Sequence, residues 1–558
     1  MNAGGWAEAA TAVRRYHALS KHHPRHYAPG PGGLDWANQP NPFRRFEGSS
    51  VVPLPLVSGE GMLAYDHLFR PTEGLGSPLD GPSLGLFFEL SLGLSAWKEY
   101  GSSRWALRNN PSSGNLHPTE GYLVLSADID DELVAGVYHY LPHEHALERR
   151  CRFAGEVLAT VVSAVAPGGT LVGLSSVHWR EAWKYGERAF RYCQHDAGHA
   201  IGSLRMAARV LGWRLRVLAS PSDALVAALL GLDRREDFAG AEPEHPDGLM
   251  LLDPTGRAAT NDELGAELAA VVRSAEWCGR ANLLSPAHVP WRAMQSVAEA
   301  AAKPKSRSAA GRHMQPTGAP AALVDAATEP AADAAGIIRQ RRSAVAMDGH
   351  TRMTRANFFR MLARTMPDPG RPPWDAWPWP AAVLLGLFVH RVEGLAPGLY
   401  LLARAPERLD SFRETARGDW LAWQPVEDCL LPLWALMPGA DLQDTAALIS
   451  CNQDIAADGA FSLGMLADLD RNLAEDGPWA YRRLYWECGL IGQVLYLEAE
   501  ALGLRATGIG CFFDDLMHEM FGFADGLGAW QSLYHFAVGG PVEDTRLRTS
   551  PAYAHLER

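Results

Sequence analysis

The strongest periodic pattern of apolar positions in the chain lies between residues 186 and 213. Apolar side chains recur there at intervals of three and four residues, at Phe190, Cys193, Ala197, Ile201, Leu204, Ala208 and Leu211. This spacing puts them on one face of an α-helix. Gly212 follows at the position where a left-handed residue often ends a helix. The pattern therefore predicts one long core helix.

A second copy of this helix occurs later in the chain. Residues 186–213 align without a gap to residues 477–504, and the same offset continues beyond the end of the helix. The matched pairs are Ala189 and Ala480, Arg191 and Arg482, Gly198 and Gly489, Ala208 and Ala499, Gly212 and Gly503, Asp223 and Asp514, and Gly231 and Gly522. A matched run of this length predicts an internal duplication.

A second fixed offset extends the duplication to strands. Pro111, Pro118, Gly136 and Tyr138 match Pro373, Pro380, Gly398 and Tyr400, and the strand-like runs 121–125 and 382–387 lie beside each other. Helices alternating with short strands predict α+β layers. Small residues on the repeated helices (Ala197, Gly198, Gly202, Gly489 and Gly492) allow close approach of the two copies, or equally close packing inside one copy.

The length and the composition divide the chain in two. A chain of 558 residues exceeds the roughly 250–300 residues at which a single core stops growing. Residues 296–335 are rich in Ala and Pro and poor in large apolar side chains, which is typical of a linker. We therefore predict a first domain at residues 1–295, a linker at 296–335 and a second domain at 336–558.

Charge and cysteine usage exclude several classes of protein. The net charge of −13 argues against nucleic-acid binding, which needs clustered cations. The seven cysteines contain no CxxC pair, so neither a zinc cage nor a disulfide framework is expected, and a reducing cytoplasm fits best. The chain has no run of about eighteen apolar residues and no signal-like start, so no membrane association or export is expected.

The most informative polar segment precedes the first predicted strand. Pro111, Ser112, Ser113 and Asn115 present two hydroxyls and an amide in a turn just before residues 121–125. By composition alone, this segment could equally be a well-formed turn without a ligand.

The pattern Pro-Ser-Ser-x-Asn-x-x-Pro at residues 111–118 resembles the flavin-contacting loop of the nitroreductase superfamily. More narrowly, the chain resembles the SagB/ThcOx type, which includes azoline dehydrogenases that act on peptides. Further segments of resemblance are residues 16–24, 34–48, 135–147 and 183–199 in the first half and, more weakly, 337–344, 392–400, 507–515 and 533–547 in the second. The resemblance implies two tandem nitroreductase-like α/β domains, each with a mostly antiparallel central sheet flanked by helices, which form a pseudo-dimer and bind FMN.

In that superfamily, one subunit supplies an Arg-x-Ser segment for the flavin phosphate and the other supplies the Pro-Ser-Ser loop. The second half keeps Arg341 and Ser343, where the first half has Leu79 and Gly81. Conversely, Ser112, Ser113 and Asn115 of the first half correspond to Trp374, Asp375 and Trp377. The resemblance therefore implies one composite FMN site per chain and one decayed site, filled by Trp374, Trp377 and Trp379. The alternative for Arg341 is a solvated basic turn.

By the same resemblance, Arg108, Gly508 and Gly510 also contact the cofactor. The third phosphate-binding position holds Val345 in place of a cation, so we expect Arg546 or Arg548 to compensate.

Lys184 and Tyr185 form the second chemical element that the resemblance suggests. Azoline dehydrogenases of this type use an adjacent Lys and Tyr to remove a proton while a hydride leaves for the flavin. A Tyr beside a cation, or a desolvated Lys, can have its pKa shifted toward neutrality. The second half has Glu475 and Asp476 instead, in agreement with one active site. The alternative is a surface Lys beside a core Tyr.

Three histidines lie near these segments without an assigned role. His195 and His199 are four residues apart on the repeated helix, but no third ligand accompanies them, so helix packing or pocket lining is expected rather than metal binding. His117 follows the Ser-Ser loop and could contact the flavin or the substrate, or simply end the loop.

The resemblance therefore implies an FMN-dependent dehydrogenase or oxidase acting on a small or peptide-derived substrate in natural-product or peptide-modification biosynthesis, with NAD(P)H or O₂ as its redox partner. The alternatives are an NAD(P)H-dependent nitro or quinone reductase and a non-catalytic flavin-binding scaffold subunit of a biosynthetic complex. Because fusion supplies both halves of the flavin site, we expect a monomer with an internal pseudo-dimer, or a weak homo-oligomer.

Overall fold

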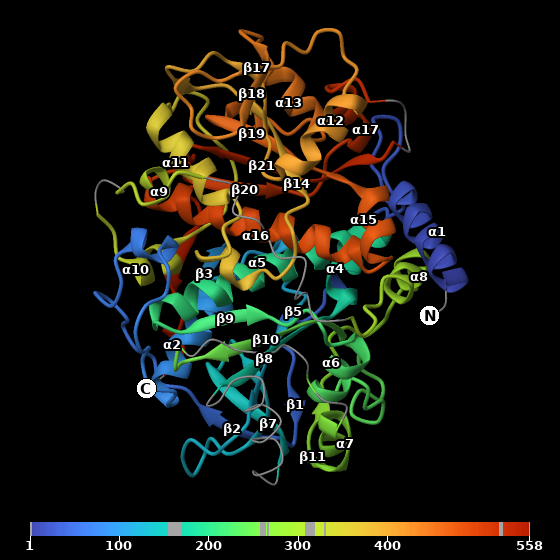
Figure 1. The fold of residues 1–558 in the computed structure, drawn as a ribbon. Coiled ribbons are helices and arrows are strands. Elements are labelled where there is room, and N and C mark those ends of the chain that lie inside the picture. Colours follow the sequence, from blue (N-terminus) through green and yellow to red (C-terminus); the bar gives the residue numbers. More distant parts are fainter. Residues whose placement is uncertain are drawn as a thin grey trace.

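The computed structural model describes residues 3–153, 169–256, 264, 267–306, 319–327, 331–523 and 528–556. Two antiparallel sheets lie on opposite sides of a central pair of long helices (Figure 1). The helices of the first half are α1 (Ala3–Leu19), α2 (Gly81–Leu92), α4 (His178–Tyr185), α5 (Ala189–Val210), α6 (Asp223–Leu230), α7 (Glu267–Ser274) and α8 (Arg292–Ala300). The later helices are α9 (Ala321–Val324), α10 (Ala334–Gln340), α11 (Arg355–Thr365), α12 (Leu409–Thr415), α13 (Gln443–Ile449), α14 (Ile455–Asp458), α15 (Leu469–Asp476), α16 (Ala480–Ala501) and α17 (Asp514–Glu519). None of these helices is long and apolar enough to cross a membrane.

Apart from the short edge strand that comes first in each, the two sheets have the same strand order. The first runs β11 (Glu276–Trp277), β7 (Ala146–Arg152), β6 (Gly136–Leu141), β5 (Thr119–Leu125), β8 (Thr170–Ser176), β10 (His245–Asp253) and β9 (Arg214–Val217), and β2 (Ser50–Pro53) also pairs with β7. The second runs β17 (Gln424–Pro425), β18 (Leu433–Pro438), β16 (Gly398–Leu402), β14 (Val383–Val389), β19 (Phe461–Asp468), β21 (Trp530–Gly539) and β20 (Arg505–Ile509). Short strands lie outside them: β1 (Phe46–Glu47) with β12 (Arg280–Ala281), and β13 (Met353–Thr354) with β15 (Val392–Glu393).

Matching details confirm that the sheets are copies. A β-bulge lies between Val137 and Tyr138 in β6, and another lies at the equivalent place between Leu399 and Tyr400 in β16. The two tyrosine hydroxyls each donate to the carbonyl four residues earlier, at 2.8 Å from Tyr138 and 2.6 Å from Tyr400. The predicted α+β class and the internal duplication are thus confirmed.

The repeated helices α5 and α16 cross at their glycines. A methyl group on Gly489 would lie 2.2 Å from the carbonyl oxygen of His195, and one on Gly198 would lie 2.3 Å from that of Trp486. The face of α5 and α16 formed by small residues therefore packs one copy against the other. The sequence had left open whether this face would pack between the copies or within one copy. Gly212 has φ +72°, so the predicted left-handed residue after the helix is also confirmed.

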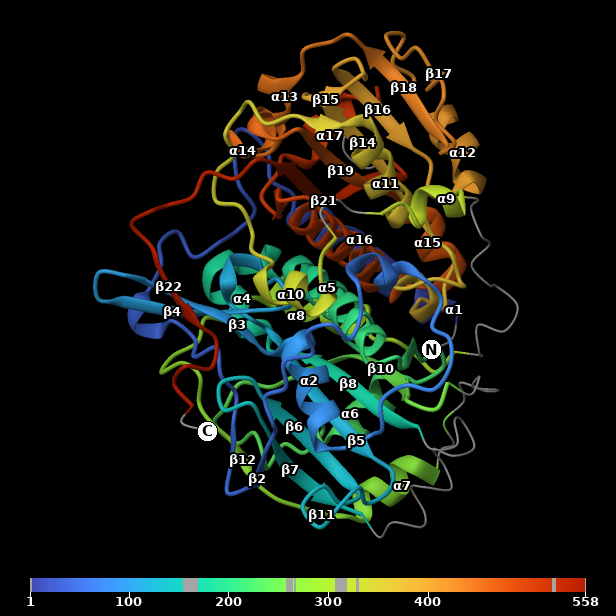
Figure 2. The same cartoon turned by 90° about the vertical axis from the view of Figure 1, so that its left-hand side faces the viewer.

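Each half also receives a terminal segment of the other. Helix α1 packs on the second half, where Arg14 pairs with Asp470 at 2.7 Å and His17 lies 3.1 Å from the Tyr481 hydroxyl. At the other end, β22 (Arg548–Pro551) pairs with β3 (Leu94–Tyr100), which continues to β4 (Ser103–Arg108) (Figure 2). The halves are therefore joined by their ends as well as by their central helices.

The linker region is partly structured. Helix α8 crosses the predicted boundary at residue 295, and its Val297 side chain is buried. Lys303 donates to the carbonyl of Pro221 at 2.6 Å. Helix α10 crosses the second boundary, while residues 307–318 and 328–330 lie outside the described residues. The domain limits at 295 and 335 stay predictions.

Candidate active site

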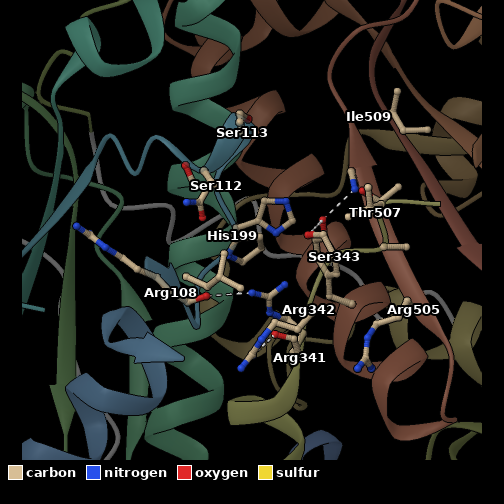
Figure 3. A pocket seen from close by; sticks show the side chains of 18 of the residues that line it. Arg108, Ser112, Ser113, His199, Arg341, Arg342, Ser343, Arg505, Thr507 and Ile509 are labelled. Atoms are coloured by element: carbon tan, nitrogen blue, oxygen red, sulfur yellow. Dashed lines mark hydrogen bonds between the residues drawn. The ribbon is translucent and has the colours of Figure 1, made fainter. Parts of the chain in front are cut away.

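A cavity of about 660 Å³ lies where the two halves meet. The first half contributes the loop between β4 and β5 and residues of α5, and the second contributes the segment after α10 and the end of β20 (Figure 3). Of the predicted site residues, Arg108, Pro111, Ser112, Ser113, Asn115, Tyr185, Arg341, Ser343, Gly508 and Gly510 line this cavity. Lys184 and Arg546 are not among its lining residues. The structure thus brings together residues of two sets, from Arg108 to Tyr185 and from Arg341 to Gly510, that lie more than 150 residues apart in the sequence.

The Pro-Ser-Ser loop is held in shape by its own side chains. Gly114, Asn115 and His117 all have φ between +53° and +59°, a region that Asn and Gly tolerate best. The Asn115 side chain donates to the carbonyl of Ala106 at 2.9 Å, and its oxygen lies 3.0 Å from His117 Nε2. The backbone N–H of His117 donates to Ser112 Oγ at 2.8 Å. The side chains of Ser112 and Asn115 therefore hold the loop in its conformation. The sequence left the role of His117 open, and the structure shows that His117 contacts Asn115 within the loop.

Asp196 of α5 anchors the same loop. Ser113 donates to its carboxylate from the backbone N–H at 3.0 Å and from Oγ at 3.0 Å. Burial raises the pKa of Asp196 to about 7, against the lowering effect of hydrogen bonds from Ser112 and Ser113. Asp196 was not among the predicted site residues. The sequence does contain a signal for Asp196, because the matching position of the second repeat is also an acid, Glu487. In the structure Glu487 likewise accepts backbone N–H groups, those of Ala382 and Val383.

Arg341 lies at the opposite wall with its guanidinium buried. It donates to the carbonyls of Asn109 at 3.2 Å and Arg108 at 3.0 Å, while its Nη1 has no partner among the described residues. Ser343 Oγ lies 2.9 Å from the Tyr496 hydroxyl, which accepts the N–H of Gly508 at 2.9 Å. The structure therefore excludes the solvated basic turn that was the alternative for Arg341.

Two further cations line the cavity near Arg341, namely Arg342 and Arg505. Burial lowers the pKa of Arg342 to about 10, which leaves it charged at neutral pH. Arg546 is exposed and pairs with Asp544 at 2.8 Å. From the sequence we expected Arg546 or Arg548 to supply the missing cation of the phosphate site. In the structure, Arg342 and Arg505 line the cavity instead.

Arg108 contributes to the wall through its backbone. Its guanidinium turns into the first half and donates to the carbonyls of Pro42 at 2.6 Å and Thr119 at 3.3 Å. Gly508 and Gly510 let the backbone of this segment pack closely against two tyrosines. A methyl group on Gly508 would lie 1.9 Å from the Tyr534 hydroxyl, and one on Gly510 would lie 2.2 Å from the Tyr192 ring. These three residues shape the cavity without presenting a side chain to it.

Lys184 and Tyr185 end helix α4 beside the loop. A methyl group on Gly114 would lie 2.5 Å from the Tyr185 hydroxyl and 3.0 Å from Lys184 Nζ. Burial, followed by the nearby carboxyl of Glu181, raises the pKa of Tyr185 well above its usual range. Tyr185 is therefore a neutral hydroxyl at physiological pH, better suited to donate a hydrogen bond or a proton than to act as a phenolate base.

His195 and His199 occupy the interface between the halves. The His195 ring stacks on Tyr534 with centroids 3.9 Å apart, and burial lowers its pKa well below the usual value. His199 lines the cavity, with Nε2 3.2 Å from the Tyr534 hydroxyl. In the part of the chain that the structure describes, no group of His, Cys, Asp or Glu side chains has a geometry that could hold a metal ion.

A smaller cavity of about 380 Å³ lies at the position related to the first by the duplication. It is lined by Arg214 to Arg216 of β9, by Gly370 and by Asp375, which match Arg505 to Thr507 of β20, Arg108 and Ser113. Arg205 pairs with Asp375 there at 2.8 and 2.7 Å. Trp374, Trp377 and Trp379 are buried but do not line this cavity. The Arg205–Asp375 ion pair therefore lies where the first half has Ser113, and the three tryptophans pack into the core instead of filling this cavity.

Comparisons with known proteins agree with this architecture. Residues 430–540 match the sequence profile of the "Nitroreductase family". The chain is 30% identical over 136 residues to the trifolitoxin-processing protein TfxB of Rhizobium leguminosarum bv. trifolii, covering 22% of this chain and 35% of that protein. It is 30% identical over 139 residues to the microcin B17-processing protein McbC of Escherichia coli, covering 23% of this chain and 50% of that protein. The chain thus spans half or less of these relatives' length.

A crystal structure described as a nitroreductase of Anabaena variabilis superposes on nearly the whole molecule. Its TM-score is 0.68 at 20% sequence identity, over 95% of this chain and 99% of that chain. That structure therefore has the same arrangement of two halves in a single chain. At this identity the likeness shows a shared fold, and within that fold residues 430–540 match the nitroreductase family model.

Proposed function

We propose that this chain is an FMN-dependent oxidoreductase with one composite FMN site, which acts on a small or peptide-derived substrate. The observation that carries the proposal is the cavity formed jointly by the Pro-Ser-Ser loop of the first half and the Arg341 segment of the second. The names of the relatives, which process trifolitoxin and microcin B17, favour a role in the maturation of a peptide product.

The polar atoms of the cavity fit a flavin mononucleotide. Buried polar groups that lack partners in the described structure include Arg341 Nη1, the Asn110 amide and His199 Nδ1, and all three residues line the cavity. A buried polar group without a partner is costly, so a ligand that supplies one is favoured. A phosphate suits Arg341, Ser343, Arg342 and Arg505, whereas the polar edge of a flavin ring suits the loop.

The roles of the residues depend on their positions. FMN bound there would supply hydride transfer. Arg341 and Ser343 would hold the phosphate end, and the loop at residues 111–115 would orient the ring system. Asp196, with a pKa near 7, can accept or release a proton close to neutral pH, and the Tyr185 hydroxyl can donate one. Lys184 lies close enough to the loop to direct the substrate or the proton.

The test measures the visible spectrum and the flavin-to-chain ratio of protein purified with added FMN. We expect about one FMN per chain, a loss of binding of at least tenfold in Arg341→Ala, and a similar loss in Asn115→Ala. Arg546→Ala is the matched control, because its guanidinium is exposed and outside the cavity lining, and it should bind FMN normally. Two FMN per chain would show that the smaller cavity is also a flavin site, and none would contradict the proposal.

Turnover separates this function from its alternatives. Rapid oxidation of NAD(P)H with many nitro or quinone acceptors would favour the broad reductase. A bound flavin that no donor reduces and no acceptor reoxidises would favour the scaffold. Reduction of the flavin by a peptide carrying an azoline, with loss of two hydrogens from the peptide, is the result expected for the proposed enzyme.

A further inference from the structure

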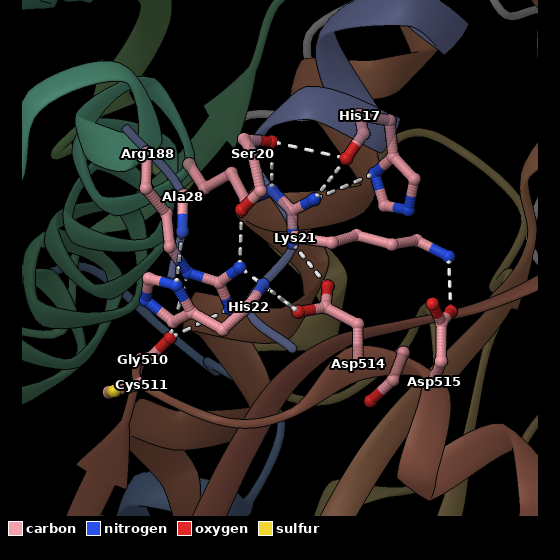
Figure 4. A network of polar contacts seen from close by, with 12 residues as sticks. His17, Ser20, Lys21, His22, Ala28, Arg188, Gly510, Cys511, Asp514 and Asp515 are labelled. Carbon is pink, nitrogen blue, oxygen red and sulfur yellow. Dashed lines mark hydrogen bonds and ion pairs between the residues drawn. The ribbon is translucent and has the colours of Figure 1, made fainter. Parts of the chain in front are cut away.

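Three segments that are distant in sequence meet beside the cavity. His22 follows α1, Cys451 lies between α13 and α14, and Cys511 follows β20 and lines the cavity. Backbone contacts hold them together: His22 forms a parallel bridge with Phe513, Phe513 N–H donates to Ile449 at 2.7 Å, and the Gln453 amide donates to the carbonyl of Cys511 at 3.0 Å. The same part of the molecule is shown in Figure 4, where Cys511 lies beside His22 and Arg188. The arrangement is therefore fixed by both halves.

The three side chains lie close enough together to shift one another's ionisation. Cys451 and His22 both act on the Cys511 thiol. His22 Nδ1 accepts the backbone N–H of Ala28 at 2.9 Å. The neutral ring therefore carries its proton on Nε2, where it can donate to the Cys511 sulfur.

The surroundings favour a thiolate at Cys511. The neighbouring Cys451, then His22 and the positive charge of Arg188, lower the pKa of the Cys511 thiol, although burial opposes them. Arg188 is itself held by donation to the carbonyl of Gly510 at 2.9 Å. The titratable groups that face the two sulfurs are His22, Arg188, Tyr185, Tyr192, Tyr27 and Asp514.

The backbone at Cys451 carries a further sign of function. Cys451 has φ +56° and Asn452 has φ +58°. Asn tolerates this left-handed conformation, whereas for a Cys it is uncommon and costs energy, so the surrounding structure must hold it.

We propose that Cys511, in the wall of the cavity, and Cys451, on the neighbouring segment, form a redox-active dithiol whose reaction partner is a low-molecular-weight disulfide. Cys511 is the attacking thiol and Cys451 is the resolving thiol. The Cys511 thiolate attacks one sulfur of that disulfide and expels the first thiolate, which leaves a mixed disulfide on Cys511. Cys451 then loses its proton and attacks the Cys511 sulfur, forming the Cys451–Cys511 disulfide and expelling the second thiolate. Two protein thiols are oxidised and one small disulfide is reduced to two thiols.

The other cysteines lack this combination. Cys151, Cys193 and Cys488 are buried, and burial raises the pKa of each. Cys278 is exposed and Cys429 is partly buried. Cys278 is therefore an internal control for an accessible thiol outside the cavity.

The test uses the full chain, with glutathione disulfide as the probe and without added flavin. After exposure, free thiols are alkylated under denaturing conditions and mapped by mass spectrometry. We expect wild-type protein to contain an internal Cys451–Cys511 disulfide. Cys451→Ser should instead trap one glutathione on Cys511, and Cys511→Ser should leave Cys451 reduced. The second measurement is the rate of alkylation of Cys511 against pH in Cys451→Ser, which we expect to remain high at least one pH unit below the range in which Cys278 loses reactivity.

Two results would overturn the proposal. One is wild-type protein in which Cys451 and Cys511 both stay reduced or both carry glutathione while Cys278 reacts. The other is Cys511 reactivity that varies with pH just as Cys278 reactivity does. His22→Gln should slow the reaction of Cys511 at least threefold at pH 6 without changing that of Cys278. Because no step uses flavin, protein that binds no FMN can still pass this test, so its result is separate from that of the proposed function.

Discussion

At the scale of single residues, the site depends on buried polar groups whose ionisation is shifted. Asp196 is the clearest case, because it joins α5 to the Pro-Ser-Ser loop through two hydrogen bonds from Ser113 while burial raises its pKa to about 7. Its ordinary value in an unfolded chain is about 3.9. Between these two values the folded protein holds a proton that the unfolded chain has released.

This difference predicts a dependence of stability on pH. Because the folded state binds more protons between about pH 4 and pH 7, the contribution of Asp196 to the free energy of unfolding falls as pH rises, by up to about 1.4 kcal/mol per pH unit. Asp196→Asn removes the titration and keeps an acceptor for Ser113. We expect the stability of this variant relative to wild type to increase from pH 4 to pH 7 in urea unfolding.

Asp470→Asn provides the control, since it removes a carboxylate that is 46% exposed on the surface, where it pairs with Arg14. A surface pair of this kind contributes at most about 1 kcal/mol. If the Asp196→Asn and Asp470→Asn variants gave the same pH profile, the buried proton at Asp196 would be refuted.

At the scale of elements, the crossing of α5 and α16 sets the distance between the halves. Gly489→Ala adds a methyl group 2.2 Å from the His195 carbonyl oxygen, a backbone atom that cannot move without shifting the helix. We expect a loss of about 1–3 kcal/mol in the free energy of unfolding and weaker FMN binding, because α5 also carries Asp196 and His199 of the cavity. Urea unfolding and the flavin-to-chain ratio measure the two effects.

The matched control is Gly336→Ala in α10. Its added methyl group meets nothing closer than 3.6 Å, so only the gain in helix propensity of up to about 1 kcal/mol should remain. A Gly489→Ala variant as stable as wild type would contradict the close packing described for these helices.

The elements also show how far local pattern reaches. The helix predicted between residues 186 and 213 is α5 with a preceding 3-10 turn, and its repeat is α16. Both arise from apolar spacing, which depends only on neighbours in sequence. Composition predicted a linker at residues 296–335, but part of this segment belongs to α8, where Val297 is buried. Composition does not reveal this burial, because it depends on packing against distant residues.

At the scale of the whole molecule, the two halves share a core and exchange terminal segments. The largest apolar cluster includes residues of both halves, such as Leu204 and Leu490. Tyr553, near the C-terminus, accepts the N–H of Leu94 at 2.8 Å. We therefore expect the chain to unfold as one cooperative unit.

Differential scanning calorimetry measures this directly. A single transition is expected, with a van't Hoff enthalpy close to the calorimetric enthalpy, as for two-state unfolding. Gly489→Ala should move the whole transition to lower temperature without splitting it. Two separate transitions in wild-type protein would show that the halves are stable independently.

The sequence alone determined the duplication, the repeated helix, the turn at residues 111–115 and the complementary loss of site residues in the two halves. These features are readable from local spacing and from comparing one half with the other. Tertiary structure decided the rest. The Arg108 guanidinium turns into the first half, Arg546 lies outside the cavity, and Asp196 anchors the loop. The proximity of His22, Cys451 and Cys511 also depends on tertiary structure. The physical reason is that these features arise from packing and burial between segments up to several hundred residues apart, and no periodicity or spacing along the chain encodes which buried polar groups will face one another.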